Sequence, residues 1–218
     1  MFDRLGKVVA QLKPGKTKMP YPIVAFEKIP YAKGIEHFDV LYQAISKQTP
    51  LQIDYKRFEK ESGKAHVFHP YLLKEYKFRW YVLGYSEKRR SKLILALDRI
   101  ETITPKKIPF KPYKGNDVQN YFDHSIGVTI NNSGVTKIEL WFSPSQSNYI
   151  KTQHLHASQE IISDDKTGMI VTLQLIPNYE LLQILLAFGP ECKVLAPLSL
   201  QEEVKGMLKR GLGLYEGE

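Results

Sequence analysis

The sequence predicts an α+β protein in which one helix and a small β-barrel are followed by a second domain of mixed strands and helices. Three observations predict this class. Apolar residues recur at helical spacing over residues 36–47, and the period then changes to two over five short segments separated by tight turns. From about residue 126, strand-like and helix-like segments alternate in the order βαββαβα.

Residues 1–35 show no sustained period. A short helix over 4–12 is expected to run into a stretch that three prolines and a glycine interrupt between residues 14 and 22. We interpret residues 1–35 as a linker, the remnant of a longer protein whose upstream region is missing.

Residues 36–111 are predicted to form the barrel domain. Its helix carries Phe38, Leu41 and Ala44 on one face and stops before Pro50. The strands are expected over 51–58, 65–76, 79–87, 93–98 and 99–108. Five short antiparallel strands after one helix are typical of a curled SH3/Sm-like barrel.

A polar and aromatic connector over 112–125 precedes the second domain, which is predicted over 126–218. Strands are expected over 135–143, 158–165, 168–177 and 191–197, and helices over 144–155, 179–189 and 199–212. This order is typical of a ferredoxin-like βαββαβ(α) domain with its helices on one face of the sheet. Ser199 is expected to cap the last helix.

The charge is unevenly distributed. The net charge is +8, yet residues 1–112 hold 23 Lys and Arg against 11 Asp and Glu, whereas residues 113–218 hold 8 against 12. An excess of cations confined to one half favours a phosphate-rich partner. The alternative is a solvated surface with scattered lysines, and the basic run over 88–92 is interpreted as such a turn.

Several classes of protein are excluded. No stretch is apolar enough to span a membrane and the N-terminal residues lack the pattern of a signal peptide, so a cytoplasmic protein is expected. The single cysteine, Cys192, is interpreted as a small buried hydrophobe. His154 and His156 would share one face of a strand but lack a third ligand, so neither a metal nor another cofactor is expected. No catalytic motif is visible, and we expect no enzyme.

Arg79, Tyr81 and Tyr71 are the first candidates for ligand binding. Strand alternation places Arg79 and Tyr81 on one face and Trp80 on the other, in the core. A guanidinium holds phosphate through two parallel hydrogen bonds, and a tyrosine ring stacks on a base. Arg99 is a further candidate, either as a second phosphate ligand or as half of an ion pair with Asp98.

Tyr55, Arg57 and His69 complete the candidate ligand-binding set. Tyr55 and Arg57 share a face of the first barrel strand, and His69 and Tyr71 share a face of the second. If those faces converge, they form a basic and aromatic cleft. The alternatives are packing for the two tyrosines and a backbone hydrogen bond for His69.

Three motifs on the predicted strands occur in a specific order. They are HPYLL at 69–73, RWYVLGY at 79–85 and DRI at 98–100. Together they resemble a WYL domain, in which Val82 stands where the name-giving leucine is expected. FSP at 142–144, FG at 188–189 and VLAP at 194–197 resemble the extension that follows many WYL domains.

The resemblance implies an Sm-like barrel that senses a nucleic acid, usually fused to an upstream winged helix-turn-helix that binds DNA. We therefore interpret the chain as the sensing module of a bacterial WYL-type transcription regulator. Its partners would be a nucleic-acid or nucleotide effector and, through a missing N-terminal domain, DNA. The alternatives are a protein-interaction or dimerisation module and a nucleic-acid-processing enzyme. The apolar helix over 179–188 is either a homodimer interface or the core of its domain.

Overall fold

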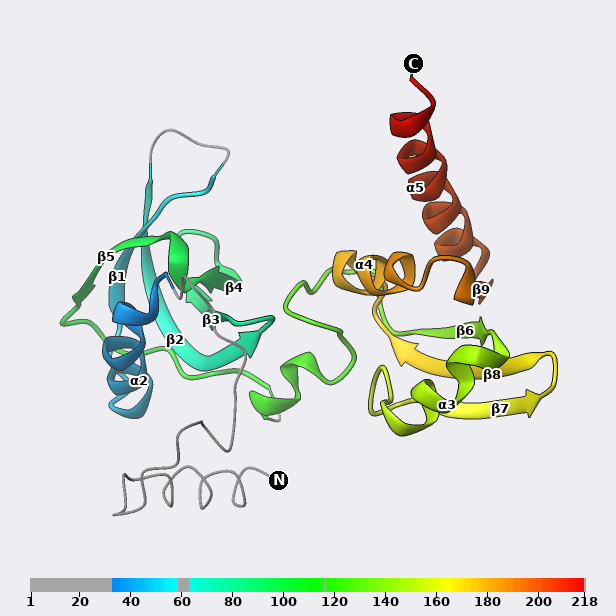
Figure 1. The fold of residues 1–218 in the computed structure, drawn as a ribbon. Coiled ribbons are helices and arrows are strands. Elements are labelled where there is room, and N and C mark those ends of the chain that lie inside the picture. Colours follow the sequence, from blue (N-terminus) through cyan, green and yellow to red (C-terminus); the bar gives the residue numbers. More distant parts are fainter. Residues whose placement is uncertain (1–32, 59–62, 116, 218) are drawn as a thin grey trace, which may run out of the picture. The chain divides into compact units, whose positions relative to one another are not determined.

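The computed structural model describes residues 33–58, 63–115 and 117–217 (Figure 1). The expected helix over 4–12 and all but the last three residues of the expected linker lie outside the described residues. None of the helices in the described part of the chain is long and apolar enough to cross a membrane.

The first described element is a single turn, η1 (Ile35–His37), that leads into helix α2 (Phe38–Ser46). The helix forms where the apolar spacing predicted it, and it buries Leu41 and Ala44 against the first sheet. It ends at Lys47, after which the chain turns into Pro50 and the first strand.

The first sheet consists of five antiparallel strands in the order β4-β3-β2-β1-β5. Their bounds are β1 Leu51–Tyr55, β2 Lys64–Tyr76, β3 Arg79–Ser86, β4 Ser91–Ala96 and β5 Ile100–Pro105. A turn of 3₁₀-helix, η2 (Leu97–Arg99), joins β4 to β5. The predicted helix and five-strand barrel are confirmed.

The long strand β2 is bent by a bulge. Pro70 pairs with Gly84 and Leu72 with Leu83, so Tyr71 is an extra residue that no residue of β3 opposes. A bulge increases the local twist and tolerates the missing N–H of a proline. The sheet can therefore curl around one apolar cluster, in which Phe68 is fully buried.

The core of the barrel follows strand alternation. Buried residues of α2 and all five strands pack together, and Trp80 packs against them with its ring edge-on to Phe38. The prediction that Trp80 belongs to the core is confirmed. The predicted tight turn at Lys77 and Phe78 is also confirmed, because both residues have positive φ, as a two-residue hairpin turn requires.

The segment between β5 and β6, which includes the predicted connector over 112–125, packs on the barrel. It contains the turn η3 (Gln119–Phe122), and Phe122 and Val128 are buried against Leu83 of β3. These contacts form an apolar cluster separate from the barrel core. The chain between the two sheets is thereby held against β2, β3 and β4 by residues such as Tyr76 and Ile94.

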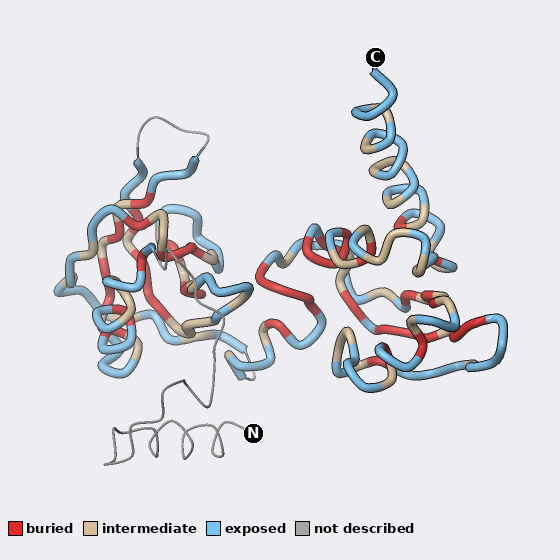
Figure 2. Tube along the Cα trace, viewed as in Figure 1, coloured by how far each residue is buried: buried red, intermediate tan, exposed pale blue. Residues whose placement is uncertain are grey.

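The second sheet has the strand order β7-β8-β6-β9, all antiparallel. The elements are β6 Thr136–Phe142, α3 Pro144–Thr152, β7 Glu160–Asp165, β8 Gly168–Leu175, α4 Tyr179–Ala187, β9 Cys192–Ala196 and α5 Leu198–Glu216. This is the predicted βαββαβα order with the ferredoxin-like arrangement of strands. Its core combines the inward residues of β6, β8 and α4 (Figure 2).

Two local expectations differ from the structure. His154 and His156 lie in the loop after α3 and not on a strand, because α3 ends at Thr152 and β7 begins only at Glu160. Helix α5 starts at Leu198 with Pro197 at its N-cap, so Ser199 lies inside the first turn and does not cap it. A side-chain N-cap is found at a different helix, α4, where the side chain of Asn178 accepts a hydrogen bond from the Leu181 N–H.

Candidate ligand-binding pockets of the barrel

A cavity of about 460 Å³, here called the barrel pocket, lies beside strands β1, β3 and β4. Tyrosines and cations line its barrel side: Tyr55, Tyr76, Lys77, Arg79, Tyr81 and Arg99. Its other wall comes from the residues before β6 and from α4, and consists of Val128, Thr129, Tyr179, Glu180 and Gln183. Ligand cavities of small molecules commonly have volumes of this order.

Asp98 sets the geometry of two arginines in the barrel pocket. Its Oδ2 lies 3.8 Å from Nη1 of Arg79, and its Oδ1 lies 3.9 Å from Nε of Arg99. Both distances exceed a normal hydrogen bond, so Asp98 orients the arginines without using their donors. The Arg79 side chain is 56% exposed, which leaves its guanidinium free to bind an anion.

Arg99 has a second support. Its guanidinium lies 4.5 Å from the ring centre of Phe58, which follows β1. This distance is within the range of a cation–π contact. Arg99 is thus held between Asp98 and Phe58, as the ion-pair alternative expected, while it still lines the pocket.

A smaller cavity of about 190 Å³, the small pocket, adjoins the barrel pocket and shares Tyr55, Ile94 and Arg99 with it. Arg57, His66 and Arg89 complete its polar lining. Burial lowers the pKa of His66, and the positive charges of Lys88, Arg89, Arg57 and Lys64 lower it further. These four cations make the electrostatic potential at this end of the barrel positive.

The tyrosines of the barrel pocket are fixed to different degrees. Tyr55 is buried in the core, and its hydroxyl accepts a hydrogen bond from the Ala96 N–H at 3.4 Å. Tyr81 is half-buried, and burial raises the pKa of its hydroxyl. A hydroxyl that keeps its proton is available as a donor to a ligand.

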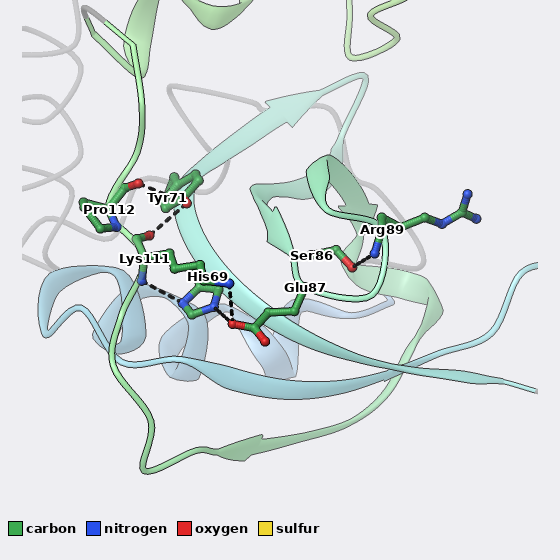
Figure 3. A network of polar contacts seen from close by, with 7 residues as sticks. All are labelled: His69, Tyr71, Ser86, Glu87, Arg89, Lys111 and Pro112. Carbon is green, nitrogen blue, oxygen red and sulfur yellow. Dashed lines mark hydrogen bonds and ion pairs between the residues drawn. The ribbon is translucent and has the colours of Figure 1, made fainter.

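His69 and Tyr71 are placed elsewhere, in a network that ties the connector to β2 (Figure 3). His69 is fully buried, and its Nδ1 accepts from the Lys111 N–H at 3.0 Å while its Nε2 lies 3.1 Å from Glu87 Oε1. The Tyr71 hydroxyl donates to the Lys111 carbonyl at 2.8 Å. Burial raises the pKa of Tyr71 to about 12.

The structure thus brings together five of the seven candidate residues: Tyr55, Arg57, Arg79, Tyr81 and Arg99. His69 and Tyr71 line neither pocket, and the backbone contacts proposed as the alternative for His69 are present. A ligand role for these two residues stays a prediction.

The lining residues that sequence reasoning did not include carry several titratable side chains, among them His66, Lys77, Arg89 and Glu180. Arg89 belongs to the basic turn that was interpreted as solvated, and its N–H donates to Ser86 Oγ, which also lies 3.0 Å from His66 Nδ1. The alternation of His66 with Phe68 on β2 was the available signal for an inward histidine. Among the described residues, no three His, Cys, Asp or Glu side chains are grouped to hold a metal ion.

Fold and pockets define a two-domain α+β protein with a cavity that cations and aromatic rings line. The sequence profile of the WYL domain matches residues 36–105, and that of the WCX domain matches residues 134–212. The chain belongs to the WYL family, in the arrangement of WYL-type regulators, where a WYL domain precedes a WCX domain.

Two solved structures are similar to this chain. Proteasome accessory factor B/C (PafBC) of Arthrobacter aurescens is 15% identical, with a TM-score of 0.39, over 89% of this chain and 29% of that chain. A CRISPR Cas-related protein is 14% identical, with a TM-score of 0.53, over 84% of this chain and 52% of that chain. The second likeness supports the fold. No curated protein matches the sequence.

Proposed function

We propose that this chain is the effector-sensing module of a WYL-type transcription regulator and that a nucleic acid or nucleotide binds in the barrel pocket and the small pocket. The observation that carries this proposal is the convergence of Lys77, Arg79 and Arg99 with Tyr55 and Tyr81 in one cavity. Effector binding would act on promoters through a DNA-binding domain of the regulator. Regulation of this kind needs no chemical conversion of the ligand.

The arginines of the pockets suit the phosphate of such a ligand, and the tyrosine rings suit its base. Guanidinium groups form paired, charge-assisted hydrogen bonds to phosphate oxygens, and the Arg79 guanidinium is both exposed and oriented by Asp98. Tyrosine rings stack on bases without strong preference for one base. Arg57 and Arg89 of the adjoining small pocket extend the positive surface along the barrel.

Fluorescence anisotropy with labelled single-stranded DNA, single-stranded RNA and cyclic dinucleotides, over a series of salt concentrations, tests this proposal. We expect binding that weakens as salt rises, because phosphate contacts release bound counterions. Arg79→Ala and Arg99→Ala should each weaken binding and reduce the salt slope by roughly one. Arg210→Ala, an exposed arginine on α5, is the charge-matched control.

Two results would contradict the proposal. If the folded wild-type chain binds none of these ligands, the protein-interaction alternative is favoured. If Arg79→Ala and Arg99→Ala behave like Arg210→Ala, the nucleic acid binds outside the barrel pocket. An oligonucleotide recovered intact after long incubation is expected for a sensor, whereas cleavage would favour the enzyme alternative.

We also propose that the module forms a homodimer. The apolar residues of α4 do not support this, because Leu181, Leu182 and Leu185 are buried in the core of their own domain. Exposed apolar residues gather instead on the second half of α5, where Leu208 and Leu212 are both at least half exposed. A two-fold assembly suits a regulator, since symmetric operators match symmetric proteins.

A further inference from the structure

The wall of the barrel pocket opposite the arginines contains a buried carboxylate. Glu180 on α4 is 6% exposed, and its Oε1 accepts three hydrogen bonds from the segment that precedes β6. The donors are Val128 N–H at 3.2 Å, Thr129 N–H at 3.0 Å and the Thr129 hydroxyl at 2.9 Å. These bonds fix the carboxylate at the edge of the pocket and saturate one of its two oxygens.

The second oxygen lacks a partner. Within the described residues, nothing donates a hydrogen bond to Glu180 Oε2, and the same holds for the hydroxyl of Tyr76, which lines the same pocket. Burial raises the pKa of Tyr76, and the negative charge of Glu180 raises it further, so the two groups act on each other. Buried polar atoms without partners are rare, because leaving them unpaired costs free energy.

The wall of the barrel pocket around Glu180 Oε2 and the Tyr76 hydroxyl differs in chemistry from the wall that carries the arginines. Tyr179 presents a ring that is 58% exposed, and Gln183 presents an amide one turn further along α4. A phosphate oxygen has no hydrogen to offer Glu180 and would be repelled by its charge. The pocket thus combines cations on one wall with an acceptor, a ring and an amide on the other.

We propose that Glu180 accepts a hydrogen bond from the base or sugar of the nucleotide whose phosphate Arg79 and Arg99 hold. The donor is either an N–H of the base or a ribose hydroxyl. Tyr179 would contribute stacking, and the Tyr76 hydroxyl would form a second hydrogen bond to the same donor group. This inference rests on the proposed function and adds to it a residue of the WCX domain that distinguishes nucleotides from other polyanions.

Glu180→Gln is the decisive variant, because it keeps the acceptor at one position and places an N–H₂ donor at the other. Its binding should be compared with that of the control variant Glu160→Gln, which removes the same charge from an exposed residue of β7. The probes are three labelled oligonucleotides of equal length: a tetrahydrofuran abasic DNA, a mixed-sequence single-stranded DNA and its RNA counterpart. The abasic strand supplies phosphates without base or ribose donors.

We expect the wild-type protein to prefer a base-bearing strand over the abasic strand. Glu180→Gln should weaken that preference roughly ten- to hundredfold, the range for a hydrogen bond to a charged group. Its affinity for the abasic strand should stay level or rise, since a negative charge leaves the pocket. A loss already present with DNA identifies a base donor, and a loss confined to RNA identifies the ribose hydroxyl.

Tyr76→Phe keeps the proposal testable if Glu180→Gln unfolds. The substitution removes a buried hydroxyl that has no partner among the described residues, so its Tm should equal or exceed that of the wild type while the preference falls. Equal effects of Glu180→Gln and Glu160→Gln on all three strands would overturn this inference alone. Absence of wild-type binding to every strand and to the cyclic dinucleotides would instead overturn the proposed function.

Discussion

Cys192 is the only cysteine in the sequence, and its surroundings determine its reactivity. It packs against the core of the second domain at the start of β9, and burial raises the pKa of its thiol to about 12. Because the thiolate is the reactive form, alkylation of the native protein at pH 8 should be about a thousandfold slower than that of a free cysteine. Labelling before and after unfolding in guanidinium, followed by mass spectrometry, measures this ratio. Fast labelling of the native protein would show that β9 opens.

His66 links protonation to stability. Its pKa in the folded protein is lowered, first by burial and then by the cations around the small pocket, so the unfolded chain binds a proton more readily. Its contribution to stability should be complete above about pH 6.5 and should be lost as the pH falls through the folded-state pKa. The free energy of unfolding, measured with urea across this range, should therefore decline less steeply in His66→Asn than in the wild type.

His156 also has a pKa lowered by burial, so His66→Asn should remove only part of the dependence of the free energy of unfolding on pH. His154→Asn, at an exposed histidine in the same loop as His156, is the matched substitution. Parallel curves for wild type and His66→Asn would show that the unfolded state holds His66 in a similar environment.

The position of η2 depends on Gly34. This residue has φ of +89°, and a Cβ there would lie 2.4 Å from the backbone N of Asp98. Gly34→Ala is expected to destabilise the protein by at least about 1 kcal/mol and to weaken ligand binding, because η2 carries both Asp98 and Arg99. Urea midpoints and anisotropy measure the two effects.

Gly211→Ala is the matched control. A Cβ at Gly211 meets open space on helix α5, so this variant should stabilise the helix by roughly 0.5–1 kcal/mol. If Gly34→Ala were as harmless, the close approach of the chain at Gly34 to η2 would not constrain the site.

The elements that were predicted correctly are those in which the alternation of apolar and polar residues follows from the local backbone geometry alone. Strand alternation on β1 and β3 places residues on two faces without reference to the rest of the chain, so Trp80 was assigned to the core. The start of α5 could not be predicted, because Ser199 and Pro197 offer competing signals in sequence. The prediction of a strand at His154 was wrong because an alternation of polar and apolar residues over only three positions is too short to be specific for a strand.

The pockets needed contacts that no local pattern encodes. Arg79 and Tyr81 are two residues apart on one strand and were predicted to act together, whereas Glu180 reaches the same cavity from a helix 101 residues after Arg79. His69 matched a family motif, yet the Lys111 N–H occupies its Nδ1. Its hydrogen-bond partner comes from 42 residues further along the chain, and a strand pattern carries no information about it.

At the scale of the whole molecule, α5 has more apolar surface than its own domain covers. Val204 and Met207 pack on the core, but the helix continues beyond them with Leu208, Leu212 and Tyr215 at spacings of four and three residues. These three residues are at least half exposed. Glycines in a helix lower its intrinsic stability, and this one contains three, so packing against a partner would help to maintain its last turns.

We therefore expect the wild-type chain to be a dimer at micromolar concentration and the double variant Leu208→Glu/Leu212→Glu to be a monomer with an unchanged fold. Two carboxylates placed in an apolar interface would have to be desolvated without partners, which disfavours association more than it affects an exposed helix. Sedimentation equilibrium gives the mass, and circular dichroism checks the fold. A wild-type monomer would exclude a dimer at these concentrations, whereas a dimeric double variant would place the interface on a surface other than α5.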